Sequence, residues 1–278
     1  MKGCLITFEG IEAAGKTTQA RLLVHRLQRG GVPVLLVREP GGTPLGERLR
    51  RLLKSARFPL APEAEALLFL SARAQLAQQV IIPALERGQW VVCDRWADST
   101  LAYQGYGRGL PLDALRAGNQ MATAGLLPAL TVLLDIPPEE SVRRRYPSAH
   151  DRFETAGPDF LRRVREGYLA LAREEPGRWL VVDATLPRQA VARTVWERVL
   201  PLLASPNPRA RGEAPVGAAQ SLRQAHPQRT VNTSGQEDRD EDSPTDRPHG
   251  EVECPPLSLG AERLRGRKAP GRPHYPHR

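Results

Sequence analysis

The chain has 278 residues, of which 26% are charged, and its formal net charge is +9. This length allows one large domain or two small ones with a buried core, and the positive charge means that a polyanionic partner must be considered. Cys4, Cys93 and Cys254 lie far apart without a CxxC pair, which argues against a disulfide framework and a zinc site and is typical of a reducing cytosol.

The sequence predicts no membrane span, because it contains no run of about 18 apolar residues. Its N-terminus leads into a short apolar strand without the pattern of a signal peptide. We therefore expect a cytoplasmic protein.

Residues 1–204 alternate apolar runs with amphipathic stretches. Five short runs are candidates for buried parallel strands, namely "CLITF", "VPVLLV", "WVVC", "LTVLL" and "WLVV". Helical patterns occur at about 15–29, 45–54, 62–86, 111–124, 158–174 and 187–203. Strands that alternate with helices predict an α/β fold, a five-stranded parallel sheet flanked by helices, with ligands at the carboxyl ends of the strands.

The stretch "FEGIEAAGKTT", Phe8–Thr18, has the spacing of a phosphate-binding loop between a predicted strand and a predicted helix. In such a loop, backbone N–H groups surround phosphate oxygens, Lys16 reaches the β- and γ-phosphates, and the Thr17 hydroxyl ligates Mg²⁺. The predicted ATP-binding residues are Gly10, Ile11, Glu12, Ala13, Ala14, Gly15, Lys16, Thr17 and Thr18. The loop alone does not distinguish a kinase from a GTPase, an ATP-driven motor or a DNA-associated ATPase.

Other stretches narrow this choice. There is no Asn-Lys-x-Asp stretch for guanine selection, and neither "VVCD" nor "TVLLD" continues into the Asp-Glu pair of a motor ATPase. Instead, Asp94 and Arg95 follow the third predicted strand, which places an arginine at a carboxyl end of the sheet.

A kinase for a phosphorylated acceptor holds two anionic groups end to end and therefore requires more cations than a hydrolase. The candidates are Arg38, Arg95, the cluster 143–145 and Arg152. Taken alone, the cluster is more commonly a solvated helix face. Arg152 lies in a loop-like stretch between two helical patterns, as expected for a short lid that carries an arginine.

Six stretches occur in the order seen in bacterial thymidylate kinases, which the chain resembles over about residues 1–203. These are "FEGIEAAGKTT", "REPGGT", "LLFLSARAQL", "DRWADSTLAYQG", "LLDIPPE" and "VVDAT". The resemblance implies a P-loop fold of the nucleoside-monophosphate-kinase type and ATP- and Mg²⁺-dependent phosphorylation of dTMP to dTDP. It also implies a homodimer. A nucleic-acid partner is less expected, because cations around two bound phosphates already explain part of the positive charge.

The resemblance further implies roles for the acceptor site. The Glu12 carboxylate would face the acceptor nucleotide near its 3′-hydroxyl. Phe69 would stack on thymine, although its periodicity alone indicates a core residue. Arg73, four residues later on the same helix face, would hydrogen-bond the carbonyl edge of the base.

Arg95 would clamp the phosphate of dTMP, with Arg38 nearby and Asp94 in the outer shell of Mg²⁺. Tyr103 would crowd the 2′ position of the ribose, although without the resemblance a tyrosine that packs a helix is an equal interpretation. The remaining pocket neighbours implied by the resemblance are Ser99, Thr100 and Gln104.

Members of this family supply a catalytic arginine from the phosphate loop or from the lid. Ala13 and Ala14 leave the loop without one, so the lid would provide it, with Arg144 favoured over its neighbour and Arg152 as a further candidate. The predicted catalytic residues are Lys16, Arg95, Arg144 and Arg152. Ala13 also replaces a glycine that is common in the family, and we expect its methyl group to be tolerated only at negative φ.

Residues 205–278 contain no Ile, Phe, Met or Trp, and 11 of the 26 prolines. Because so little apolar surface cannot offset the entropy of ordering, we expect a disordered tail behind a kinase domain of residues 1–204. Two alternatives remain open: a kinase for another nucleotide or deoxynucleoside, and a nucleic-acid-associated ATPase. Acceptor preference would identify the first, and DNA-stimulated hydrolysis the second.

Overall fold

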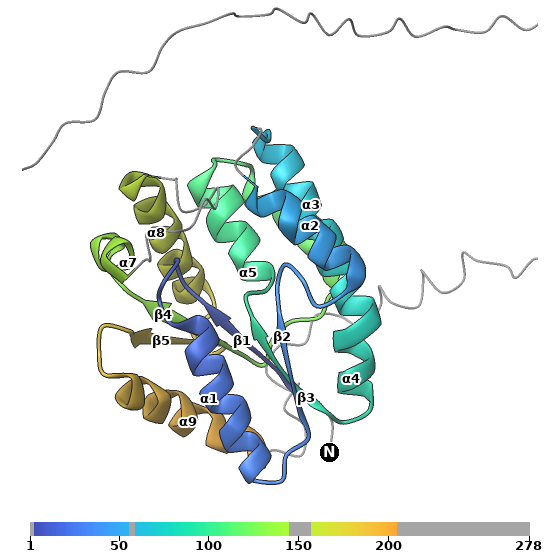
Figure 1. Ribbon diagram of the computed structural model, residues 1–278, viewed down its shortest axis with the longest axis vertical. Helices are drawn as coiled ribbons and strands as arrows, with labels where there is room; N and C mark the ends of the chain where they lie inside the picture. Colours follow the sequence, from blue (N-terminus) through green and yellow to red (C-terminus); the bar gives the residue numbers. More distant parts are fainter. Residues whose placement is uncertain (1–2, 56–58, 145–156, 205–278) are drawn as a thin grey trace, which may run out of the picture. The chain divides into compact units, whose positions relative to one another are not determined.

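A computed structural model describes residues 3–55, 59–144 and 157–204. The predicted tail and Arg152 lie outside these ranges. Within them, a parallel sheet has the strand order β2-β3-β1-β4-β5, which confirms the predicted fold class (Figure 1). Its strands are β1 (Leu5–Glu9), β2 (Val34–Arg38), β3 (Trp90–Asp94), β4 (Leu130–Asp135) and β5 (Trp179–Asp183).

The register brings the carboxyl ends of β1 and β3 to about one level, while β4 continues past them to Asp135. Phe8 of β1 lies opposite Asp94 of β3 and Val132 of β4. The loop that follows β1 therefore begins between the end of β3 and the last residues of β4, at the edge of the sheet where the ligand sites of such folds lie.

Helices cover both faces of the sheet, because neighbouring strand residues point in opposite directions. Ile6 and Phe8 belong to one buried cluster with Leu23 of the first helix, whereas Leu5 belongs to a second cluster with Leu85. The helices are α1 (Lys16–Arg29), α2 (Pro44–Lys54), α3 (Pro62–Leu76), α4 (Ile82–Glu86), α5 (Ala97–Thr100), α6 (Leu112–Thr123), α7 (Pro138–Arg144), α8 (Pro158–Glu174) and α9 (Arg188–Ala204), with π-helical segments η1 (Ala77–Ile81) and η2 (Leu101–Gly107).

The single helix predicted over 62–86 is divided. The segment η1 separates α3 from α4, and Pro83 lies in the first turn of α4. A proline has no backbone N–H and its ring clashes with the carbonyl four residues earlier, so a regular α-helix cannot pass this point unchanged.

The helical run formed by α5 and η2 was not predicted. Its sequence "ADSTLAYQGYG" has no clear helical period and contains two glycines. Both glycines are closely packed, since a Cβ atom on Gly105 would lie 2.5 Å from the end of the Leu112 side chain and one on Gly107 would lie 2.7 Å from the ring of Phe160. Tertiary contacts rather than local propensity thus hold this segment.

None of the helices in the described ranges combines the length and the apolar character needed to cross a membrane.

Candidate active site

A cleft of about 890 Å³ lies at the carboxyl ends of β1, β2 and β3. This volume is in the range of a site for small ligands. Most of the predicted site residues meet in this one cleft; those that line it are Glu12, Ala13, Lys16, Thr17, Arg38, Phe69, Asp94, Arg95, Ser99, Thr100, Tyr103, Gln104 and Arg144.

The phosphate loop joins β1 to α1 through left-handed backbone. Gly10 has φ 136° and Gly15 has φ 94°, and a Cβ atom on Gly10 would lie 2.5 Å from the carbonyl oxygen of Leu134. Ala13 has φ 57°, so our expectation that a methyl group requires negative φ here is wrong. The loop geometry imposes a left-handed conformation on this alanine, at a cost of about 1 kcal/mol.

Lys16 begins α1 and is directed back over the loop. Its Nζ donates hydrogen bonds to the carbonyl oxygens of Gly10 at 3.0 Å and Ile11 at 2.7 Å. Burial lowers the pKa of Lys16 to about 8, and the nearby Arg95 adds to this effect. The ammonium group is thus held at the loop with little competition from water.

Among the other loop residues, Ile11 and Ala14 are buried, whereas Thr18 is exposed. Their side chains do not line the cleft, so any contribution they make to phosphate binding comes from the backbone.

Thr17 and Asp94 form the hydroxyl–carboxylate pair of the site. The Thr17 Oγ1 donates a hydrogen bond to Asp94 Oδ2. Oxygen donors of this kind suit Mg²⁺, which takes one or two protein ligands and completes its shell with phosphate and water oxygens. The described residues contain no group of three or more His, Cys, Asp or Glu side chains that could hold a metal alone, so phosphate and water oxygens would have to supply the rest.

Arg95 follows β3 in a left-handed conformation, with φ 74°, and its N–H donates to the Phe8 carbonyl at 3.0 Å. Its Nη2 lies 3.1 Å from Glu12 Oε1 and 3.0 Å from the Tyr103 hydroxyl. Its Nη1 lies 3.0 Å from the Gly10 carbonyl oxygen. The guanidinium therefore spans the first glycine of the phosphate loop and the acceptor side of the cleft.

The electrostatic surroundings of Arg95 keep it charged. Burial by itself would lower its pKa, but Tyr103, Tyr168, Glu12 and Glu9 outweigh burial and raise the pKa of Arg95 well above its ordinary value. Glu12 also accepts a hydrogen bond from the Tyr103 hydroxyl at 2.7 Å. The carboxylate in the phosphate loop thus hydrogen-bonds to Arg95 and Tyr103 on the acceptor side of the cleft.

Phe69 lines the cleft, but Arg73 lies behind its wall with a side chain only 1% exposed. The guanidinium of Arg73 contacts both carboxylate oxygens of Glu39, at 3.0 and 2.5 Å. It also donates to Thr100 Oγ1 at 2.8 Å and Asn119 Oδ1 at 2.5 Å. The predicted contact of Arg73 with a base would require one of these bonds to be exchanged.

Gln104 is buried as well, and its amide donates to Glu65 Oε1 at 2.9 Å. Arg38 lies at the rim, 55% exposed and 3.2 Å from Glu47. Arg144 donates to Glu140 at 2.6 Å and to the Ala184 carbonyl at 3.0 Å. Arg38 and Arg144 thus each lie beside a glutamate at the cleft.

Sequence reasoning missed Tyr168, which contacts both Arg95 and Ser99, and Glu9, which accepts hydrogen bonds from Ser99 and Tyr168. Glu9 could have been noticed as a charged residue at the end of a strand that is otherwise apolar. Tyr168 left no signal, because it lies on α8, far from every motif in the sequence.

Comparisons with known proteins agree with this geometry. The sequence model of the family described as thymidylate kinase matches residues 8–195. The thymidylate kinase of Deinococcus radiodurans is 50% identical over 202 residues, which cover 71% of this chain and 97% of that protein. The thymidylate kinase of Thermomicrobium roseum is 53% identical over 196 residues, covering 70% of this chain and 93% of that protein.

A solved structure supports the same assignment. The crystal structure of thymidylate kinase from Ehrlichia chaffeensis matches with a TM-score of 0.59 and 33% sequence identity, covering 72% of this chain and 99% of that one. The family model covers more than half of the sequence, and the relatives are matched over nearly their whole length. This chain belongs to the thymidylate kinase family.

Proposed function

We propose that this chain transfers the γ-phosphoryl group of ATP to dTMP, giving dTDP and ADP, in the cleft at the carboxyl ends of β1–β3. The observation that carries this proposal is that one cleft is lined by both the phosphate loop and a second set of cationic and aromatic side chains. A hydrolase needs one phosphate site, whereas a nucleotide kinase must hold two anions end to end.

The donor end of the cleft is the phosphate loop. Lys16 would release its carbonyl partners in the loop and bind phosphate oxygens of ATP, where its charge stabilises the developing negative charge. Thr17 and Asp94 would hold Mg²⁺, which when bound neutralises charge on the β- and γ-phosphate oxygens.

At the acceptor end, the proposal assigns the phosphate of dTMP to Arg95, with Arg38 nearby at the rim of the cleft. Glu12 and Tyr103 border the sugar, Phe69 stacks on the base, and Arg73 supports this wall. Since Arg95 also contacts the first loop carbonyl at 3.0 Å, a phosphate bound to it would lie next to the γ-phosphate on the loop.

The cation on the transferred group would come from outside the phosphate loop. Ala13 and Ala14 carry no charge, so we assign this role to Arg144, which lines the cleft from α7, and to Arg152. Arg144 would exchange Glu140 and the Ala184 carbonyl for phosphate oxygens.

The proposal includes a homodimer in the cytoplasm. Leu67 on α3 and Met121 on α6 are 63% and 79% exposed, and these two helices pack against each other. Apolar side chains on adjacent helices are suited to an interface between two copies. Cys4 and Cys93 are free thiols, in keeping with a reducing compartment.

The test is ADP release from ATP–Mg²⁺ with dTMP, dUMP, TMP with a ribose sugar, dCMP, dGMP, AMP, thymidine and DNA offered separately. We expect strong preference for dTMP. Preference for another monophosphate or for thymidine would favour the alternative that the chain is a kinase for another nucleotide or a deoxynucleoside. Hydrolysis stimulated by DNA, with no effect of any monophosphate, would favour a nucleic-acid-associated ATPase.

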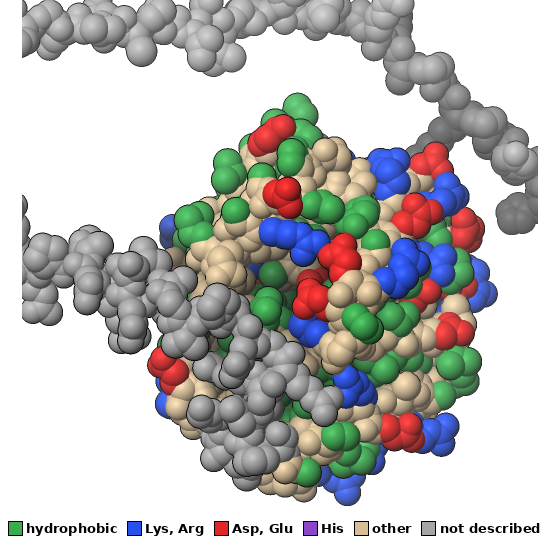
Figure 2. Space-filling model, turned by 180° about the vertical axis from the view of Figure 1, so that it is seen from behind, with side chains coloured by type: hydrophobic (Ala, Val, Ile, Leu, Met, Phe, Trp, Pro, Cys, Tyr) green, Lys and Arg blue, Asp and Glu red, His purple; other side chains and the backbone are tan. Residues whose placement is uncertain are grey.

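The face of the molecule shown in Figure 2 does not favour this last alternative. On the face shown in Figure 2, Lys and Arg side chains lie interspersed with Asp and Glu side chains over the described residues. A nucleic-acid-binding face is instead expected to concentrate positive charge in a patch or stripe.

A further inference from the structure

Arg95 is held between two tyrosine hydroxyls, each of which leads to a carboxylate. On one side, Nη2 donates to Tyr103, which donates to Glu12. On the other side, Nη1 lies 3.2 Å from the hydroxyl of Tyr168, which donates to Glu9 Oε2 at 2.9 Å. The first pair lines the cleft, but the second pair does not.

Glu9 accepts three hydrogen bonds, two from the segment that carries Arg95 and one from α8. Its Oε1 accepts from the backbone N–H of Trp96 at 2.7 Å. Its Oε2 accepts from Ser99 Oγ at 2.6 Å in addition to Tyr168. Since Trp96 directly follows the left-handed Arg95, this carboxylate fixes the backbone at the point where the arginine leaves β3.

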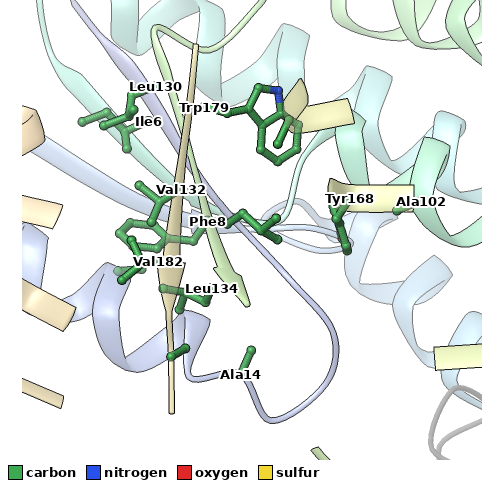
Figure 3. Packing of buried hydrophobic residues seen from close by; sticks show 14 of the residues in the cluster. Ile6, Phe8, Ala14, Ala102, Leu130, Val132, Leu134, Tyr168, Trp179 and Val182 are labelled. Carbon is green, nitrogen blue, oxygen red and sulfur yellow. The ribbon is translucent and has the colours of Figure 1, made fainter. Parts of the chain in front are cut away.

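Tyr168 connects this network to a distant part of the chain. It lies on α8, is fully buried, and belongs to the apolar cluster of Figure 3. Its ring packs edge-on against that of Tyr103, with centroids 6.2 Å apart. Because packing fixes the ring, the position of the Tyr168 hydroxyl is fixed as well. The hydroxyl lies within hydrogen-bond distance of Arg95, Ser99 and Glu9.

We propose that Tyr168 and Glu9 are positioning residues for Arg95, which hold its guanidinium in place for the acceptor phosphate without touching the substrate. The proposal rests on the function proposed above, in which Arg95 binds that phosphate. Pre-organised donors lose less entropy and reorganise less when the anion arrives.

The test compares dTMP with thymidine, which shares the nucleoside but lacks the phosphate. In Tyr168→Phe the ring packing remains and the hydroxyl is lost. We expect the Kd for dTMP, measured by calorimetry, to rise about tenfold, as for loss of a hydrogen bond to a charged group. The Kd for thymidine and the KM for ATP should change less than about twofold.

Tyr106→Phe is the matched control. Tyr106 lies on η2 and packs against Gly167 of α8, but it does not line the cleft and is not part of the hydrogen-bond network around Arg95. It should leave both ligands unaffected. Equal weakening of dTMP and thymidine by Tyr168→Phe would overturn the proposal, since Tyr168 would then shape the nucleoside pocket. No weakening of dTMP would also overturn it.

Glu9→Gln tests whether the carboxylate acts through the phenol. If the carboxylate acts through the phenol, Glu9→Gln should raise the Kd for dTMP at least threefold less in the Tyr168→Phe variant than in the wild type. The reason is that the two groups then act in series. Additive effects would remove Glu9 from the proposal.

Arg95→Ala separates this inference from the proposed function. If Arg95→Ala leaves the preference for dTMP over thymidine intact, Arg95 is not the phosphate clamp and the proposed function must be revised. If Arg95→Ala abolishes that preference while Tyr168→Phe preserves it, only the positioning role fails.

Discussion

Lys16 is the side chain on which turnover should depend most. It is buried, bonded to two loop carbonyls and held near the phosphate position. Lys16→Ala should lower kcat by about 10²- to 10³-fold, as when a preorganised charge on a transferring group is lost. Steady-state ADP release measures this. Lys54→Ala is the control, because Lys54 is a cation of α2 on the same cleft, and it should change kcat less than about threefold. Near-normal turnover of Lys16→Ala would refute the proposed role of Lys16.

Glu9 makes the stability of the fold depend on pH. Burial, with a contribution from Asp98, raises its pKa from 4.5 to about 7, so the folded chain binds this proton more tightly than the unfolded chain. The stabilisation is fully present below about pH 4.5 and is lost as the pH rises through 7, a difference of about 3 kcal/mol.

Glu9→Gln should therefore raise Tm by several degrees at pH 8 and by much less at pH 5. Thermal unfolding followed by circular dichroism at several pH values checks this. Glu86→Gln, at an exposed glutamate, is the control and should show no such trend. A Tm difference that stays constant from pH 5 to pH 8 would contradict the assignment of the raised pKa.

For individual residues, the sequence predicted the site side chains that belong to recognisable motifs. It missed those that only the tertiary fold brings together. Phe69 and Arg95 lie in stretches whose spacing and resemblance indicated the cleft. Arg73 shares the helix face of Phe69, but its depth behind Thr100 depends on Glu39 and Asn119, which come from other elements. Burial of this kind is a tertiary property that local spacing does not encode.

Among the elements, β5 is tied to the sheet by a buried ion pair at its start. Arg178 binds Asp98 of α5 through two nitrogens, at 2.7 and 3.0 Å, and also donates to Thr131 of β4. Both charged side chains are at most 10% exposed. The pair thus links three elements at the amino end of the last strand.

Arg178→Met should destabilise the protein by about 3 kcal/mol, because it leaves the Asp98 carboxylate buried without its partner. Urea unfolding measures the loss. Arg116→Ala breaks a pair with Glu174 whose members are 41% and 45% exposed, and it should cost less than about 1 kcal/mol. Similar losses in the two variants would show that burial does not strengthen the first pair.

The strands were predictable because a buried parallel strand requires a short, nearly continuous apolar run. The boundaries of the helices were less predictable where an α-helix continues as a π-helix. The segments η1 and η2 add a residue to a turn, and this is decided by Pro83 and by contacts of Gly105 and Gly107, not by hydrophobic period. The fold class survives such local errors because topology depends on the order of strands and helices.

For the molecule as a whole, the exposed apolar side chains of α3 and α6 predict association. Leu67→Glu combined with Met121→Lys should convert a dimer into a monomer, because charges at the centre of an apolar interface lose their hydration on assembly. Light scattering after size exclusion measures the mass. Leu200→Glu, an exposed leucine of α9, is the control and should remain dimeric; a monomeric wild type would contradict the prediction.

The catalytic unit should end with α9. The family match ends at residue 195, and 71% of this chain covers 97% of the Deinococcus radiodurans relative. Truncation after Ala204 should leave kcat and KM for dTMP within about twofold, since every residue of the proposed site precedes that point in the sequence. A collapse of kcat or of soluble yield would show that residues 205–278 contribute to the enzyme.

The strand order has a consequence for biosynthesis. The phosphate loop is encoded at the N-terminus, yet Gly10 is packed against Leu134 and β1 needs β4 as its second neighbour. At a translation rate of about 5–20 residues per second, β4 is therefore synthesised roughly ten seconds after the phosphate loop. Until then the edge of β1 that pairs with β4 is exposed and apolar, and an unpaired apolar edge of this kind is prone to aggregation.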